Sequence, residues 1–190
     1  MDETPTTAAP PAFDEAFRAQ FEALLRWRRD VRRFREDPVD AALVDRLIAL
    51  AGLAPSVGNS QPWRFVKVDD PARRRAVRAS FEACNRDALA DYRGERARLY
   101  ASLKLAGLDR APVHPAVYAD TATALGDGLG RRTMPEMLQY SVVTAVHGLW
   151  LAARAYGLGV GYPEEEHVDP ELERHRWQER IDVARCIVQR

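Results

Sequence analysis

The chain has 190 residues and equal numbers of acidic and basic side chains, so its formal net charge is zero at pH 7. That length suits one domain with a substantial core, and the balanced charge gives no electrostatic reason to expect a nucleic acid or a membrane as partner. Two cysteines build neither a disulfide framework nor a zinc site, which favours a cytoplasmic protein without a metal centre. Residues 1–12 lack the apolar run of a signal peptide and predict a disordered leader before a single domain over residues 13–190.

The first part of the chain predicts two helices. Residues 13–29 form the first, because apolar side chains recur on one face: Phe17, Phe21, Leu24 and Leu25. The second begins after Asp40, the expected N-cap, and ends near Gly52. Its expected buried face consists of Leu43, Val44, Leu47, Ile48 and Ala51.

Strands are fewer than helices in this pattern. Residues 54–62 concentrate Pro, Gly and Asn, which predicts an irregular loop before a strand at residues 63–68. A second strand is expected at residues 113–118, and the Gly-rich residues 124–132 predict another loop. Two clear strands among many helical segments indicate an α+β fold with an incomplete sheet.

The longest predicted helix follows a capping box formed by Thr133 and Glu136. It is apolar on most sides and should therefore be central in the fold, with these core residues: Leu138, Val142, Val143, Val146, Leu149, Trp150 and Ala153. The helix should stop near Gly157, and regular signals fade after Gly161.

An arginine segment stands at the end of the first predicted helix and contains Arg28, Arg29, Asp30 and Arg32. Arg28 and Arg32 are four residues apart, so on a helical turn they would share a face. Two guanidinium groups on one face suit a phosphate, because each offers forked N–H donors. The alternative is a solvated basic helix end that complements the helix dipole.

A second candidate site is the loop at residues 55–62. Gly58 and small side chains would let a ligand approach the backbone closely. Ser56, Asn59 and Gln61 supply hydrogen-bond donors and acceptors within a few residues, as a polyol or a heterocycle edge requires. An ordinary turn before a strand is the alternative.

A third candidate is the Gly-rich run at residues 126–132, which includes Arg131 and Arg132 and precedes a helix N-terminus. Such a corner favours anions. A lid beside a site and a plain flexible loop both stay open. No Gly-Lys-Ser/Thr follows and no strand immediately precedes, so the run is neither a Walker loop nor a Rossmann fingerprint.

The arginine segment and the loop occur in an order and at a distance that resemble the flavin-dependent nitroreductase family. The resemblance implies a central mixed sheet flanked by helices, and a homodimer with flavin mononucleotide (FMN) at its interface. It implies that three arginines hold the flavin phosphate, namely Arg28, Arg29 and Arg32. It also implies that three loop residues contact the ribityl chain or the isoalloxazine ring, namely Ser56, Asn59 and Gln61.

Asp30 narrows the resemblance to one branch of that family. Nitroreductases commonly have Ser at this position. A carboxylate among phosphate-binding arginines would repel the phosphate, so Asp30 should have a separate function. The branch that has Asp lets dioxygen attack reduced FMN, as substrate, and fragments it to 5,6-dimethylbenzimidazole, the lower ligand of vitamin B12. Asp30 would then move protons near the ribityl C1′. The alternative for Asp30 is a structural salt bridge to Arg28 or Arg33.

Six further segments match the family, and the continuous resemblance ends at Gly161. The matching segments are residues 54–65, 104–108, 111–114, 128–131, 133–136 and 149–154. After Gly161 the chain resembles the family only once some tens of residues are skipped. The skipped part includes a strand and a Ser that the family uses beside the Asp. Arg174 matches a family arginine that reaches the flavin phosphate, but the segment that should precede it in the family is absent here. Loss of a strand predicts unpaired backbone groups on its neighbours, a destabilised fold and impaired activity.

Two other functions stay open on the sequence. One is an NAD(P)H-dependent flavin reductase or nitroreductase, and the other is a non-catalytic flavin-binding remnant. The expected ligands are reduced FMN and dioxygen. The expected partners are a second copy of the chain and a flavin reductase that draws electrons from NAD(P)H, with no nucleic acid and no membrane.

Overall fold

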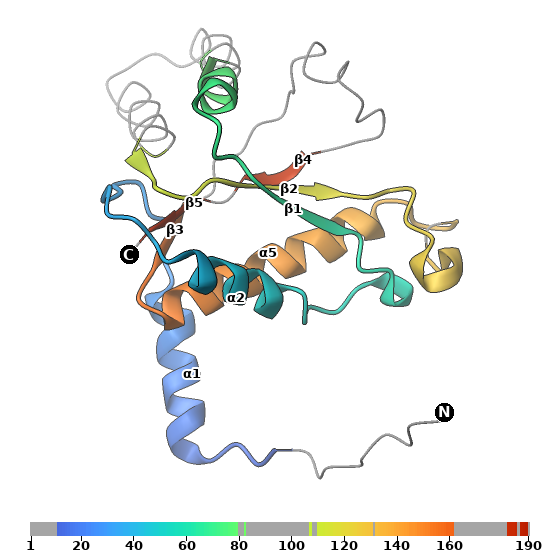
Figure 1. Ribbon diagram of the computed structural model, residues 1–190. Coiled ribbons are helices and arrows are strands. Elements are labelled where there is room, and N and C mark those ends of the chain that lie inside the picture. Colours follow the sequence, from blue (N-terminus) through green and yellow to red (C-terminus); the bar gives the residue numbers. More distant parts are fainter. Residues whose placement is uncertain are drawn as a thin grey trace, which may run out of the picture.

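The computed structural model describes residues 11–79, 82, 107, 110–130, 132–161, 182–185 and 187–189. Its named elements are α1 (Glu15–Trp27), α2 (Ala41–Ala51), η1 (Val57–Asn59), β1 (Trp63–Lys67), β2 (Pro115–Ala119), η2 (Leu125–Gly128), α5 (Met137–Ala155), β3 (Gly159–Gly161), β4 (Asp182–Arg185) and β5 (Ile187–Gln189). Helices α2 and α5 lie together on one side of β1 and β2, and α1 projects from the end of α5 (Figure 1). The α+β class predicted from the sequence is confirmed. Residues 1–10 of the predicted leader lie outside the described residues.

The strands of the described residues pair as two antiparallel ladders. One has the order β1-β2-β4, with Trp63 opposite Ala119 and Lys67 opposite Pro115. The other joins β3 to β5. Among these residues, parallel pairing is limited to an isolated bridge between Asp30 and Val160, so this bridge is the parallel component of the expected mixed sheet.

Helix α5 is the centre of the core, as its apolar sequence predicts. Its buried residues are Leu138, Ser141, Val142, Ala145, Val146, Leu149 and Ala153. They pack with Leu47 and Ala51 of α2 and with Val117 of β2. Val143, expected in the core, is instead 48% exposed, and Tyr140 beside it is 54% exposed. One side of α5 therefore has no apolar cover among the described residues.

The predicted boundaries of α2 are confirmed. The Asp40 side chain accepts a hydrogen bond from the amide of Ala42, as an N-cap should, and Gly52 is the C-cap. Val44, Leu47 and Ala51 are buried, whereas Leu43 and Ile48 are half-buried at the margin of the same face.

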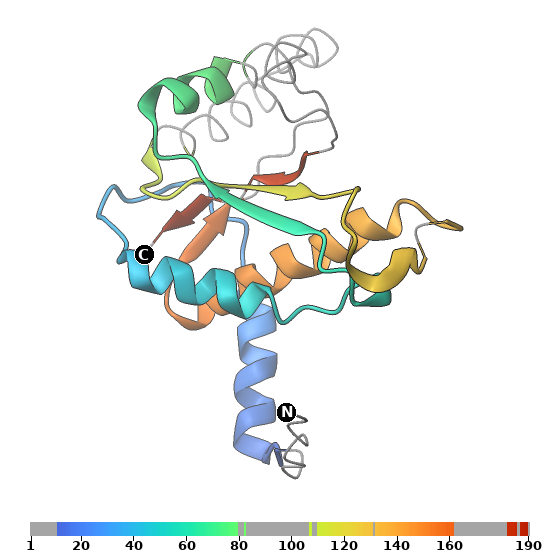
Figure 2. The same ribbon diagram turned by 45° about the vertical axis from the view of Figure 1, so that its right-hand side comes forward.

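Helix α1 is shorter than predicted and stands apart from the core. Asp14 caps its start, and it ends at Trp27 because Arg28 takes an extended conformation. All thirteen residues of α1 are described and none is buried. Its predicted apolar stripe lies at the surface of the chain, with Phe17 and Phe21 each 46% exposed. Both views show the helix pointing away from the body (Figures 1 and 2).

The predicted capping box of α5 is wrong. The helix begins at Met137 with Glu136 at the N-cap, and no side chain caps it among the described residues. Thr133 Oγ1 instead donates to the carbonyl of Gly130 at 3.4 Å, so this hydroxyl belongs to the preceding Gly-rich turn. The other end agrees with the prediction, because Gly157 has φ +77° just past the helix.

The C-terminal residues correct the expectation that a missing strand leaves its neighbours unpaired. Strand β4 pairs with β2, and β5 pairs with β3 at three positions from Gly159–Gln189 to Gly161–Ile187. Backbone groups of β2 and β3 thus find partners in a segment that the sequence did not predict to be ordered. Within the described residues, no helix is long and apolar enough to cross a membrane.

Candidate flavin site

The arginine segment leaves α1 as extended chain. Arg28 has φ −60° and ψ 128°, and the amide of Val31 donates to the carbonyl of Val160 at 3.0 Å. The prediction that Arg28 and Arg32 share a helical face is therefore wrong. In extended chain, residues two apart lie on the same side.

Asp30 pairs within this segment. Its Oδ2 forms an ion pair with Nη2 of Arg32, and the side chains of Asp30 and Arg32 are 32% and 26% exposed. The sequence suggested Arg28 or Arg33 as structural partners, and the structure shows Arg32 in that place. A carboxylate exposed to this degree lies within reach of a ligand that approaches the arginines.

Trp150 of α5 contacts the start of the segment in two ways. Its Nε1 donates to the carbonyl of Arg29 at 3.2 Å, and Cζ of Arg28 lies 4.8 Å from the centroid of its ring. The Arg29 guanidinium folds back on the end of α1, where Nη1 donates to the carbonyl of Arg28 at 2.9 Å. Beside these contacts is an open pocket of about 150 Å³, whose other walls include Trp27, Arg154, Leu158 and Gly159.

The helical pattern predicts Trp150 in the core but does not predict its contact with the arginines. The residue type alone could have predicted a polar contact here, because the N–H of an indole needs a hydrogen-bond acceptor when the side chain packs inside a protein. Trp150 is half-buried, so its ring joins the core to the candidate site.

The loop at residues 55–62 has the strained backbone that a ligand-binding turn often shows. Gly58, Asn59 and Gln61 have φ of 56°, 52° and 42°. The conformation is held from within, since Ser56 Oγ accepts from the amide of Gln61 at 3.0 Å and Asn59 Oδ1 accepts from Gln61 Nε2 at 3.2 Å. The three predicted loop residues thus contact one another. Positive φ at a non-glycine residue costs about 1–3 kcal/mol and tends to cluster at functional sites.

The Gly-rich run packs directly against this loop. A Cβ on Gly126 would lie 2.2 Å from the carbonyl oxygen of Gly58, and one on Gly130 would lie 2.2 Å from Cγ2 of Val57. Glycine is therefore required where η1 and η2 meet. The sequence left open whether the Gly-rich run is a lid beside a site or a plain flexible loop. Its close packing against residues 57 and 58 does not fit a plain flexible loop. Arg131 lies outside the described residues.

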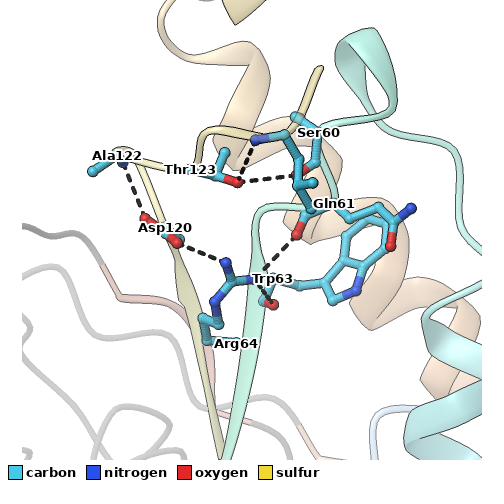
Figure 3. A network of polar contacts seen from close by, with 8 residues as sticks. Ser60, Gln61, Trp63, Arg64, Asp120, Ala122 and Thr123 are labelled. Atoms are coloured by element: carbon cyan, nitrogen blue, oxygen red, sulfur yellow. Dashed lines mark hydrogen bonds and ion pairs between the residues drawn. The ribbon is translucent and has the colours of Figure 1, made fainter. Parts of the chain in front are cut away.

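A polar network ties the two loops to the sheet (Figure 3). Arg64 of β1 donates to Asp120 at 2.6 Å and to the carbonyl of Gln61 at 3.1 Å. Thr123 Oγ1 donates to the carbonyl of Ser60 at 3.3 Å. The backbone on both sides of Gln61 is thereby held from β1 and from the chain that follows β2.

The arginine segment and the loop attach to different faces of α5. The amide of Val57 donates to Ser141 Oγ at 3.1 Å, whereas Arg29 accepts from Trp150. Ser141 and Trp150 are nine residues apart, which on an α-helix is about 13 Å of rise and a rotation of about 180°. One chain therefore does not bring its two predicted flavin-binding parts together on one side of α5. The remaining predicted site residue, Arg174, lies outside the described residues.

Known proteins agree with this fold. Residues 25–165 match the nitroreductase family. A 5,6-dimethylbenzimidazole synthase from Rhodospirillum rubrum is 51% identical, and the match covers 90% of this chain and 94% of that protein. Another from Rhodobacter capsulatus is 52% identical over 149 residues, which is 78% of this chain and 72% of that protein. The crystal structure of iodotyrosine deiodinase bound to FMN and 3-iodo-L-tyrosine superposes with a TM-score of 0.70 at 23% identity, covering 89% of this chain and 88% of that one. The chain belongs to the nitroreductase family.

The match to the Rhodospirillum rubrum synthase contains a gap. It extends over 199 aligned residues, yet 90% of this 190-residue chain is only about 171 residues, so about 28 positions of the relative have no counterpart here. The Rhodobacter capsulatus match needs no such gap, because 149 residues equal about 78% of this chain.

Proposed function

We propose that this chain is a 5,6-dimethylbenzimidazole synthase that fragments reduced FMN with dioxygen. The observation that carries the proposal is a carboxylate, Asp30, held by an ion pair inside the arginine segment of a chain 51% identical to a synthase of that name. Bound FMN would supply the flavin ring that reacts with dioxygen and the carbon atoms of the product. The residues of this chain bind it, orient it and move protons.

The arginine segment suits the flavin phosphate. Guanidinium groups offer paired N–H donors that match phosphate oxygens, and Arg28, Arg29 and Arg32 supply three of them within five residues. Asp30 pairs with Arg32, which keeps part of the positive charge of the segment balanced. In the proposed site Arg174 would add a further phosphate contact.

Asp30 is the proposed acid and base of the reaction. Breaking carbon–carbon and carbon–nitrogen bonds requires protons to be moved, and a carboxylate close to the ribityl C1′ can do this. Its ion pair with Arg32 fixes the orientation of the carboxylate. The Ser that relatives of this branch use beside the Asp falls in the segment that this chain is proposed to lack.

A homodimer would complete the site. The loop with Ser56, Asn59 and Gln61 attaches to α5 at Ser141 and Thr144, whereas the arginine segment attaches at Trp150, on a different face nearer the other end of the helix, so a second copy would be needed to place one chain's loop beside the other's arginines. The exposed stripe of α1 and the uncovered side of α5 offer apolar surface for such an association. We propose that FMN lies between the two chains.

The chain is also proposed to lack an internal segment after about residue 162. The gap of about 28 positions in the match to the Rhodospirillum rubrum synthase supports this. Pairing of β4 with β2 and of β5 with β3 would compensate in part for the lost strand. Reduced FMN would come from a flavin reductase using NAD(P)H, with both proteins in the cytoplasm.

The test is an aerobic incubation of the purified chain with excess reduced FMN, followed by chromatography for 5,6-dimethylbenzimidazole. Product should form with the wild type and be absent with Asp30→Asn. Asp37→Asn is the matched control, because Asp37 also pairs with an arginine two residues away, Arg35, but on an exposed part of the chain. Its product yield should equal that of the wild type.

Other outcomes would replace the proposal. Steady oxidation of NADH by the chain alone, with FMN recovered intact, would indicate a flavin reductase or nitroreductase. Tight FMN binding with neither product nor NADH oxidation would indicate a non-catalytic flavin-binding protein.

A further inference from the structure

We propose that Trp150 is a positioning residue that presents Arg28 to the flavin phosphate, and that Arg28 is the principal phosphate ligand of this chain. The inference rests on the proposed binding of FMN. It goes beyond the predicted set of three equivalent arginines, because the structure gives each arginine a different environment.

Trp150 fixes both the backbone and the side chain at this point. Its indole N–H donates to the carbonyl of Arg29 at 3.2 Å, which holds the peptide directly after Arg28. Its ring lies 4.8 Å from Cζ of Arg28, within the range of a cation–π contact. Because α1 has already ended at Trp27, no helical hydrogen bonds continue beyond Arg28 to hold the segment in place. The segment is held instead at two points, by Trp150 of α5 at Arg29 and by the hydrogen bond of the Val31 amide to Val160, and the first of these is the one next to Arg28.

The two other arginines have interactions that compete with phosphate. Arg32 forms an ion pair with the carboxylate of Asp30, so part of its charge is balanced. Arg29 donates through Nη1 to carbonyls at the C-terminal end of α1, including that of Arg28 at 2.9 Å. A ring contact takes no N–H donor from a guanidinium group. Among the described residues, the Arg28 guanidinium contacts the Trp150 ring and has no hydrogen-bond acceptor, so its forked N–H donors can serve an anion while its position is restrained.

The place of Arg28 also suits an incoming ligand. Arg28, Trp150 and Arg154 line the same open pocket of about 150 Å³ at the C-terminal end of α5. Both Arg28 and Trp150 are half-buried, which makes the cation–π contact stronger than it would be at a fully exposed site. A phosphate at this pocket would meet a guanidinium that has already lost much of its conformational freedom.

The experiment compares oxidised FMN with riboflavin, which has the same ring and ribityl chain but no phosphate. Dissociation constants are measured by quenching of flavin fluorescence with the full-length chain. Trp150→Leu should weaken FMN binding about tenfold, equal to about 1.4 kcal/mol, and leave riboflavin binding within about twofold. Trp150→Phe keeps a ring but loses the N–H, so it should weaken FMN binding by about threefold.

Arg28→Ala decides whether Trp150 acts through Arg28. In that background Trp150→Leu should add less than a twofold effect, because the group that it positions is gone. Tyr156→Leu is the matched control, since it removes an exposed aromatic ring at the C-cap of α5, and Tyr156 does not line the pocket that Arg28 and Trp150 share. Its affinity for FMN should equal that of the wild type.

Four results would overturn the inference. Equal weakening of FMN and riboflavin binding by Trp150→Leu would show that the tryptophan supports the fold or the ring site only. Unchanged FMN binding by Trp150→Leu, or full additivity with Arg28→Ala, would show that it does not act on the phosphate contact. Failure of the wild type to bind either flavin would reject the proposed function together with this inference.

Discussion

The contact between the two glycine-rich loops leads to a quantitative prediction for Gly126→Ala. A methyl group at Gly126 would lie 2.2 Å from the carbonyl oxygen of Gly58 and 3.2 Å from the amide nitrogen of Ser60, so the two loops must separate. Overpacking of this kind costs about 1–3 kcal/mol. The φ of +78° adds about 1–2 kcal/mol for any residue with a Cβ. We therefore expect the free energy of unfolding to fall by about 2–5 kcal/mol.

Gly157→Ala separates the two causes. Gly157 has φ +77°, almost the same as Gly126, but a Cβ there would meet no atom within 4 Å. It should therefore lose only the conformational part, about 1–2 kcal/mol. Urea unfolding of both variants gives the difference directly. If Gly126→Ala and Gly157→Ala cost the same, the loops do not press against each other as described, and their packing does not shape the flavin loop.

Three further predictions concern the core, the dimer and the C-terminal strands. Leu149→Ala should lower the free energy of unfolding by about 2–5 kcal/mol, because Leu149 is 1% exposed, whereas an effect no larger than that of Val143→Ala would contradict the assigned core. Phe17→Glu with Phe21→Glu should convert the proposed dimer to a monomer in analytical ultracentrifugation, and an unchanged sedimentation coefficient would show that α1 is not part of the proposed interface. Deletion of residues 182–190 should lower the melting temperature because β2 and β3 lose their pairing partners, and an unchanged value would show that these strands do not stabilise the sheet.

Local patterns in the sequence were sufficient for several elements. Asp40 before a run of apolar residues predicted the start of α2, and an aspartate side chain satisfies a free amide there whatever surrounds the helix. The length and apolar character of α5 predicted a central helix, since such a surface has to be buried. These predictions succeeded because they depend on contacts within a few residues or on the hydrophobic effect alone.

The arginine segment shows where local reasoning failed. A four-residue spacing suggested a shared helical face for Arg28 and Arg32, but α1 ends at Trp27 and the chain then pairs with Val160, which lies about 130 residues away in sequence. The contact of Trp150 with Arg28 and Arg29 spans a similar distance. No pattern within one segment contains such contacts.

The sequence by itself determined the fold class, the family resemblance and the residue types of the proposed flavin site, because these follow from hydrophobic periodicity and from short motifs. Only the tertiary structure decided which of those residues meet. It separated the arginine segment from the loop by the body of α5, joined the loop to the Gly-rich run through Gly58 and Gly126, and paired C-terminal strands with β2 and β3. The physical reason is that each of these contacts joins residues far apart in the chain, and its geometry depends on how the helices and strands pack around the core.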